Sequence, residues 1–350
     1  MHVGILTGGG DCPGLNAVIR AVTLALVREC GARVTGIERG FQGLLTRHAR
    51  PLVPVEVAGI LSEGGTVLGT HNSCNPFAAG HDRSGEAMDF VRELGLDALV
   101  AIGGDGTMTI AHRFEALGLP VVGVPKTIDN DLQHTERTFG FDSAVAVVSE
   151  ALDRLRTTAR SHGRVMIAET MGRYAGWIAL EGGMAGGADA ILLPELPYDV
   201  ERVAAYCRAR EADGGSTLIC IAEGAHGRGQ AMTLSQRIED SPDPLRLGGV
   251  AHALQRQLQP LLASEVRATV LGHTQRGGSP TAYDRVLATR FGYHAAQLVK
   301  ARRYGRMVAL QGDTCVSVAL SEVAGKLRLV PADHALVQAA RGIGVELGAD

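Results

Sequence analysis

The sequence predicts an α/β fold built from doubly wound, mostly parallel sheets. Short apolar runs bounded by glycine alternate along the chain with longer stretches whose apolar residues recur at helical spacing. Uninterrupted Val, Ile and Leu runs are typical of strands buried on both faces, as in parallel sheets. The alternation of strand and helix favours a doubly wound arrangement. Glycine is frequent, at 46 of 350 residues, and clusters in the loops after these strands.

The expected elements follow in chain order. The first strand, Val3 to Thr7, precedes a helix from Leu15 to Glu29. Two more strands, at 97–104 and 119–125, enclose a helix at 107–118. Later apolar runs predict strands at 164–170, 190–195, 216–224 and 268–272. In such sheets, ligands bind beyond the carboxyl ends of the strands, where the glycine-rich loops lie.

Composition excludes several classes of protein. The formal net charge of −3 and a pI near 6.5 offer no electrostatic basis for binding nucleic acid or an anionic membrane. The six cysteines are scattered without C-x-x-C spacing, which favours reduced thiols over disulfides. We found no signal peptide and no apolar run of the roughly 18 residues that a membrane span needs. We therefore expect a soluble, cytoplasmic protein.

Two glycine-rich loops suit bound phosphate. The first, TGGGDCPGLN from Thr7 to Asn16, precedes a helix whose free N–H groups favour an anion, although a tight turn is the alternative. It matches neither the dinucleotide fingerprint nor the Walker A pattern. The second, IGGDGTM from Ile102 to Met108, places Asp105 at a helix start. If phosphates bind here, the Asp105 carboxylate is suited to hold Mg²⁺. The alternative is that Asp105 only caps the helix.

A third loop, PKTIDND, follows the strand at 119–125. Its residues Thr127, Asp129 and Asp131 alternate, so in an extended segment all three face one way. One carboxylate there can accept the proton of a substrate hydroxyl while the other holds a metal or orients its neighbour. A solvated loop is the alternative for this segment.

Arginines near predicted strand ends point to an anionic substrate. Arginine forms bidentate contacts with phosphate, whereas an isolated arginine is more often part of a surface ion pair. The arginines concerned are Arg164, Arg173, Arg267 and Arg276.

Together, these motifs resemble those of 6-phosphofructokinases. GILTGGGDCPGLNAVIRA, IGGDGT, PKTIDND, MGRYAGWIAL and VLGHTQRGGSP occur in family order between about residue 3 and about residue 300. The resemblance implies two Rossmann-like α/β domains. The domain for the phosphoryl donor would hold residues 1–140 and about 255–300. The domain for fructose 6-phosphate would hold about 141–254 and 301–340.

The resemblance also implies Mg²⁺-dependent phosphoryl transfer to the 1-hydroxyl of fructose 6-phosphate and assigns residues to it. Asp129 would be the general base, and Arg173, Thr127 and Lys126 would act beside it. The donor would lie at Gly10, Gly104, Asp105, Gly106 and Thr107, with Asp105 as the metal ligand. The sugar phosphate would lie at Thr127, Asp129, Asp131, Arg164, Met171, Gly172, Arg173, Glu223, Arg267, His273 and Arg276. Without the family, His273 is more often a packed histidine, Glu223 a surface acid at a strand end and Met171 a core residue.

The family pattern leaves two donors in view. Gly106 is typical of ATP users because it leaves room for the nucleotide, whereas Lys126 is typical of pyrophosphate users. This mixture resembles an actinobacterial-like subgroup of ATP- or pyrophosphate-dependent phosphofructokinases. We expect ATP, since steric exclusion is the stronger filter, and keep pyrophosphate as the alternative. In the loop from Gly69 to Phe77, His71 and Asn72 stand where the family usually has an arginine, and the loop is one residue longer.

Two rival functions come from other classes. NAD and lipid kinases share a G-G-D-G-T loop but lack PKTIDND and GHTQRGG. A phosphosugar-binding paralogue without catalysis is the non-enzymatic rival, and intact Asp105, Asp129 and Arg173 argue against it. The family also suggests a homotetramer or homodimer whose sugar site is shared, with Arg164 and Arg267 supplied by the neighbouring subunit.

Overall fold

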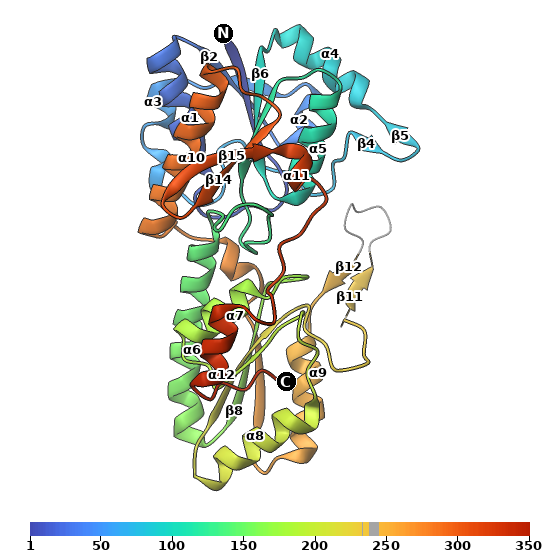
Figure 1. Ribbon diagram of the computed structural model, residues 1–350, viewed down its shortest axis with the longest axis vertical. Helices are drawn as coiled ribbons and strands as arrows, with labels where there is room; N and C mark the ends of the chain where they lie inside the picture. Colours follow the sequence, from blue (N-terminus) through green and yellow to red (C-terminus); the bar gives the residue numbers. More distant parts are fainter. Residues whose placement is uncertain (233, 238–244) are drawn as a thin grey trace. The chain divides into compact units, whose positions relative to one another are not determined.

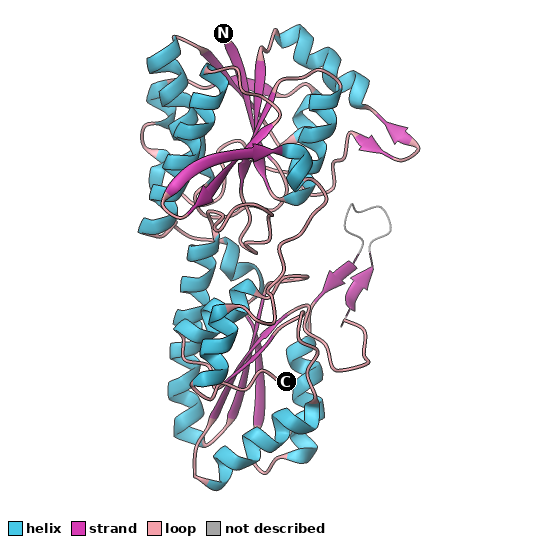
Figure 2. Ribbon diagram, viewed as in Figure 1, coloured by secondary structure: helices cyan, strands magenta, loops and turns pink. Residues whose placement is uncertain are grey.

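The computed structural model describes residues 1–232, 234–237 and 245–350, and the chain divides into two compact units. In each unit a central sheet is covered by helices on both faces (Figure 1, Figure 2). The first unit comprises Met1–Ile128, Leu132–Asp142 and Arg276–Leu327. The second comprises Asp129–Asp131, Ser143–Gln275 and Arg328–Asp350.

The first unit is built on a seven-stranded sheet with the order β15-β14-β7-β6-β1-β2-β3. Its central strands are parallel, and only the edge pairs β14–β15 and β2–β3 are antiparallel. The strands are β1 (His2–Thr7), β2 (Arg33–Ile37), β3 (Ala49–Pro51), β6 (Ala98–Gly103), β7 (Val121–Pro125), β14 (Arg306–Gln311) and β15 (Thr314–Ala319). A separate short hairpin is formed by β4 (Phe77–Ala78) and β5 (His81–Asp82).

Helices pack on the two faces of this sheet. On one face, α2, α4, α5 and α11 bury their apolar residues in a common core. On the other face, α1 and α10 pack so closely that a Cβ atom on Gly292 would lie 2.8 Å from Ala21 Cβ. The helices are α1 (Leu15–Cys30), α2 (Phe41–Thr46), α3 (Pro54–Val57), η1 (Ile60–Ser62), α4 (Ser84–Leu94), α5 (Asp105–Ala116), α10 (Ala282–Lys300) and α11 (Leu320–Val323). The short helix η3 (Gly272–Arg276) lies almost entirely in the second unit.

The second unit is built on a four-stranded, fully parallel sheet with the order β13-β8-β10-β9. Helices α8 and α9 pack on one face of it, and α6 and α7 on the other. The strands are β8 (Val165–Thr170), β9 (Ala190–Leu192), β10 (Thr217–Ala222) and β13 (Val266–Val270), with an antiparallel pair β11 (Leu234–Arg237) and β12 (Leu245–Leu247). The helices are α6 (Phe141–His162), α7 (Trp177–Ala185), α8 (Val200–Ala212), α9 (Val250–Leu258), η2 (Gln259–Leu261) and α12 (Ala335–Gly342).

The predicted fold class is confirmed, and each expected strand and helix is present. Boundaries differ by a few residues; β9, for instance, ends at Leu192, just before Pro194, which has no N–H to donate to a sheet. The cysteines are free thiols, as expected. Within the described part of the chain, no helix has the length and apolar character needed to cross a membrane.

The division of the chain differs from the expected domain boundaries in two long segments and two short ones. The short ones are Asp129–Asp131, which belong to the second unit, and residues 141–142, which belong to the first. Residues 255–275 belong to the second unit, because β13 pairs with β8 there. Residues 301–327 belong to the first, because β14 extends the first sheet beside β7 and β15 pairs with β14. Such long-range strand pairing leaves no local mark in the sequence.

Candidate active site

In the first unit, two cations converge on the first glycine-rich loop, at the carboxyl end of β1. The buried Lys126 Nζ donates to the carbonyl oxygen of Gly10, and Arg276 Nη1 donates to that of Asp11 at 3.1 Å. A Cβ atom on Gly10 would lie 2.8 Å from Arg276 Nη1, so any side chain there would displace the Arg276 guanidinium from this loop. The family resemblance assigns Arg276 to the sugar phosphate, which stays a prediction; in the structure its guanidinium contacts this loop. The loop is therefore electropositive, as a phosphate site requires.

Thr107 joins the first two loops. Cβ atoms on Gly8 and Gly103 would lie 2.6 Å and 2.2 Å from its Oγ1, and Thr107 itself is buried. These glycines are therefore needed for packing. Gly106 is different, because it is exposed and a Cβ atom there would meet nothing within 4 Å. The fold itself does not demand glycine at 106.

Asp105 begins α5, and Gly104 precedes it as the N-cap. Its Oδ1 accepts a hydrogen bond from Gly325 N at 2.9 Å rather than capping its own helix. Burial raises the pKa of Asp105, and that hydrogen bond only partly offsets the effect. No cluster of three or more His, Cys, Asp or Glu forms a metal site among the described residues. A lone, half-buried carboxylate fits Mg²⁺, which keeps several waters and binds through one or two carboxylates plus phosphate.

The third loop is not extended, so the predicted alternation of side chains does not hold. A turn spans Ile128 and Asp129, and Asn130 adopts a left-handed φ of 52°. Thr127 belongs to the first unit, where its carbonyl accepts from Thr138 Oγ1 at 2.6 Å. Asp129 and Asp131 belong to the second unit. Buried Asn130 tolerates this conformation better than most residues.

In the second unit, Asp129, Arg173 and Glu223 form an electrostatically coupled cluster. Burial, and then the negative charge of Asp129, raises the pKa of Glu223 to about 7, although the Arg173 guanidinium acts in the opposite direction. The cluster thus combines a carboxylate, a cation and a carboxyl group that keeps its proton close to neutral pH. Perturbed carboxyl groups of this kind are typical of functional sites.

Two glycines shape the loop that carries Arg173. Gly172 has φ 128°, and a Cβ atom there would lie 2.8 Å from the Ala175 carbonyl oxygen. Gly224 N donates to Gly172 O at 3.1 Å, and a Cβ atom on Gly224 would lie 1.8 Å from Arg173 O. The loops after β8 and β10 therefore touch backbone to backbone, which places Arg173 and Glu223 side by side.

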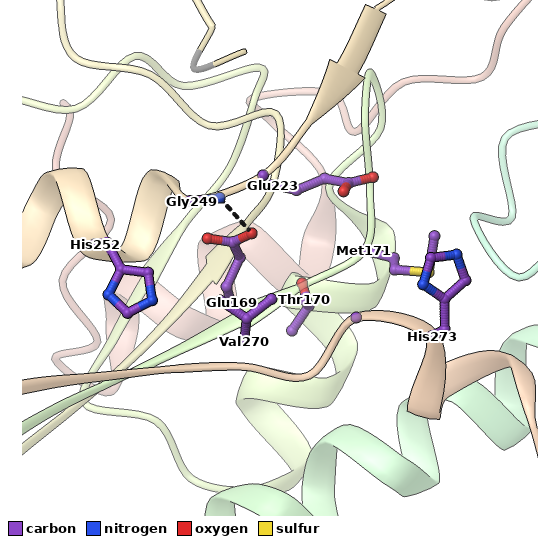
Figure 3. Close-up of a pocket in the computed structure, with 10 residues that line it drawn as sticks. Glu169, Thr170, Met171, Glu223, Gly249, His252, Val270 and His273 are labelled. Carbon is purple, nitrogen blue, oxygen red and sulfur yellow. Dashed lines mark hydrogen bonds between the residues drawn. The ribbon is translucent and has the colours of Figure 1, made fainter. Parts of the chain in front are cut away.

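Beside this cluster, a pocket of about 420 Å³ opens at the carboxyl ends of β8, β10 and β13 (Figure 3). Three predicted sugar-site residues, Met171, Glu223 and His273, line it. Its volume lies within the range of small-molecule sites. Sequence reasoning missed two other lining residues, His252 and the buried Glu169. Glu169 accepts from Gly249 N at 3.0 Å and Ala251 N at 2.9 Å at the start of α9.

Gln275 is a further residue that the sequence did not single out. It is fully buried, accepts from Met171 N at 3.2 Å and donates to Gly272 O at 3.0 Å. It therefore ties the Met171 loop to the turn that carries His273. Its place inside the GHTQRGG motif was the available signal.

Arg164 and Arg267 lie away from this pocket. Glu265 pairs with both, at 2.5 Å from Arg164 Nε. Arg267 pairs in register with Met166, five residues before Met171 along a parallel strand. At about 3.3 Å per residue, the level of Arg267 in the sheet is therefore roughly 17 Å from Met171 at the pocket. Both arginines thus lie near the amino ends of the strands, opposite the pocket of their own chain.

The loop that lacks the expected arginine lies against the first glycine-rich loop. Thr70 Oγ1 donates to Gly9 O, and Thr7 Oγ1 donates to Gly69 O at 2.8 Å. His71 Nδ1 accepts from Ser73 N at 3.3 Å, which stabilises the loop itself.

Comparisons with known proteins agree with this geometry. The family described as Phosphofructokinase matches residues 2–299. A protein of Chloroflexus aurantiacus called ATP-dependent 6-phosphofructokinase is 50% identical, over 99% of this chain and 98% of its own. A protein of Amycolatopsis methanolica called pyrophosphate–fructose 6-phosphate 1-phosphotransferase is 49% identical, over 95% of this chain and 97% of its own length. The Pichia pastoris phosphofructokinase structure superposes with a TM-score of 0.82 at 31% identity, over 92% of this chain but only 35% of that longer one. This chain belongs to the phosphofructokinase family.

Proposed function

We propose that this protein is an ATP-dependent 6-phosphofructokinase, which converts fructose 6-phosphate and ATP into fructose 1,6-bisphosphate and ADP in glycolysis. The observation that carries the proposal is the Asp129–Arg173–Glu223 cluster beside a pocket of about 420 Å³ in a chain of this family. The cluster contains the base and the cation that phosphoryl transfer needs, and the pocket has room for a sugar phosphate.

In the proposed reaction, the carboxylate of Asp129 accepts the proton of the 1-hydroxyl as its oxygen bonds to the terminal phosphorus. The bond between that phosphorus and the bridging oxygen breaks, and ADP leaves. Arg173 compensates the charge on the transferring group, and Thr127 and Asp131 flank the base. Such transfer passes through a loose transition state, so positioning and charge compensation carry most of the catalysis.

The sugar phosphate would bind in the second-unit pocket. Glu223, whose pKa of about 7 leaves it partly protonated near neutral pH, can donate to or accept from a sugar hydroxyl. Met171, Gly172 and His273 would complete the wall around the sugar. Arg164 and Arg267 would serve the site of a neighbouring subunit, since both lie at the far end of their own sheet. The proposed assembly is therefore a homodimer or homotetramer with shared sugar sites.

The donor phosphates would lie on the loops of the first unit. Gly10 and Gly104 offer backbone N–H groups, Lys126 and Arg276 supply positive charge, and Thr107 holds the loops together. Asp105 would hold Mg²⁺, which neutralises phosphate charge when bound. Open space at Gly106 supports ATP, because no neighbouring protein group needs glycine there.

Pyrophosphate is the second candidate donor. Two observations favour pyrophosphate. One is Lys126, and the other is the 49% identical relative from Amycolatopsis methanolica, which is named as a pyrophosphate-dependent enzyme. The cytoplasmic location expected from the sequence stays a prediction.

Turnover of purified protein tests these proposals. Fructose 6-phosphate and Mg²⁺ are incubated with ATP or with pyrophosphate, and fructose 1,6-bisphosphate is measured. We expect product with ATP and a loss of about 10²- to 10⁴-fold in kcat for Asp129→Ser, as for removal of a general base. Near-normal turnover of that variant would refute the mechanism. Product with pyrophosphate alone would select the second donor, and sugar binding without any product would indicate a binding paralogue.

A further inference from the structure

A short C-terminal segment, Arg328 to Val330, contacts both loops that carry the proposed catalytic groups. It lies beyond residue 299, where the match to the family ends, and sequence reasoning found no motif in this part of the chain. It belongs to the second unit, together with the loop of Asp129 and the loop of Arg173. We call Arg328–Val330 the brace.

The first contact is with the loop of Asp129. Arg328 N donates to Asp131 O at 2.7 Å, and Arg328 Nη1 donates to Asn130 O at 3.0 Å. The second of these carbonyls belongs to Asn130 itself, whose φ is left-handed and which is 1% exposed. Asparagine adopts that conformation more readily than most residues, and contacts with its surroundings hold it there. Arg328 supplies two of the hydrogen bonds that do so.

The second contact is with the loop of Arg173. Val330 N donates to Glu195 Oε1 at 2.8 Å, and the same oxygen accepts from Gly176 N at 3.0 Å. Gly176 is the N-cap of α7, where the loop of Arg173 ends. Glu195 therefore links the brace to that loop through one carboxylate oxygen, Oε1.

The brace is itself anchored by Trp177. The Arg328 guanidinium carbon lies 4.2 Å from the centre of the indole, and Trp177 Nε1 donates to Arg328 O at 3.0 Å. Trp177 is 2% exposed, so this cation–π contact is largely desolvated. Arg328 is thus held by its side chain and by its backbone.

We propose that Arg328 is a positioning residue for phosphoryl transfer: together with Glu195 and Trp177, it sets the loop of Asp129 relative to the loop of Arg173. The inference rests on the proposed function, because it matters for turnover only if those two residues act together. Proton transfer and phosphate stabilisation both depend steeply on position, and a misplacement of about 1 Å can cost 10²-fold in rate.

Substitution of Arg328 provides the test. In Arg328→Gln we expect kcat to fall about 10- to 100-fold while KM for each substrate changes less than about twofold, because binding groups stay and only alignment is lost. Arg328→Lys should recover only part of the rate. Lysine keeps the positive charge, but its ammonium lacks the planar guanidinium that contacts Asn130 O and the indole at the same time. Arg202→Gln is the matched control: it removes ion pairs to Glu346 and Asp350 in the same C-terminal region and should leave kcat unchanged.

A second measurement does not depend on turnover. Amide hydrogen exchange of residues 128–133 and 171–176 should be faster in Arg328→Gln than in wild type, and unchanged in Arg202→Gln. Glu195→Gln should slow turnover as well, and the double variant should lose less than the product of the single losses, because both act through one brace.

These outcomes distinguish a failure of the brace proposal from a failure of the proposed function. Unchanged exchange in Arg328→Gln would overturn the brace, and so would faster exchange with a normal kcat. If wild-type protein shows no turnover, the proposed function fails, and exchange alone then shows whether the brace holds the loops. If Arg328→Gln does not fold, Arg328→Lys provides the same comparison.

Discussion

Replacing Glu223 by glutamine should change how the stability of the second unit depends on pH. Burial and the charge of Asp129 raise the pKa of Glu223 from 4.5 to about 7 in the folded protein. Between these values the unfolded chain releases the proton and the folded chain keeps it, so stability falls as pH rises through this window. Below pH 4.5 both states hold the proton, and above about pH 7 both have lost it.

The size of the effect follows from the shift. Each pKa unit corresponds to about 1.4 kcal/mol, so wild type should lose at most about 3 kcal/mol between pH 4.5 and pH 8 through this carboxyl group. Glu223→Gln cannot ionise and lacks this loss. Relative to wild type, the variant should therefore gain up to about 3 kcal/mol of unfolding free energy over that range.

Urea unfolding at a series of pH values measures this difference. Trp177, the single tryptophan, lies in the same unit as Glu223, so its fluorescence follows the relevant part of the molecule. Asp129→Asn provides an internal check, because removing that charge should shift the window towards lower pH. Parallel pH curves for wild type and Glu223→Gln between pH 5 and pH 8 would show that Glu223 is not perturbed as described.

Three further predictions concern single positions. Gly106→Asp should keep its thermal stability, since a side chain there meets no neighbouring protein atom. It should lose at least about 10-fold in kcat/KM for ATP, because the added side chain occupies the room left for the nucleotide and its charge repels phosphate. Unchanged ATP kinetics would remove the argument for ATP. Gly224→Ala should destabilise the protein by more than about 2 kcal/mol and slow turnover, because the alanine Cβ would lie 1.8 Å from Arg173 O. A normal melting temperature of this variant would contradict the close approach of the two loops. Arg164→Ala and Asp129→Asn subunits, each inactive alone, should regain activity when co-assembled if sugar sites are shared; mixed oligomers without activity would refute the sharing.

Much of the site was predictable because its residues sit in local motifs. Loops at the carboxyl ends of Val- and Ile-rich strands were identified from glycine and apolar patterning, and the structure has strands at each of those places. Asp105 at the start of α5 also follows from local order. The turn at Asn130 was not foreseen, because the left-handed φ is enforced by contacts with residues about 200 positions away.

By itself, the order of amino acids determined the α/β class, the succession of strands and helices, and the kinds of side chain present at the strand ends, because all of these depend on neighbours along the chain. Tertiary structure alone decided which strands join which sheet, that Glu169 and His252 line the pocket, and that Arg164 and Arg267 lie away from it, near the amino ends of the strands. It also decided that burial and the nearby Asp129 raise the pKa of Glu223. Burial, strand pairing and electrostatic coupling are properties of distance in space, and no local pattern encodes them.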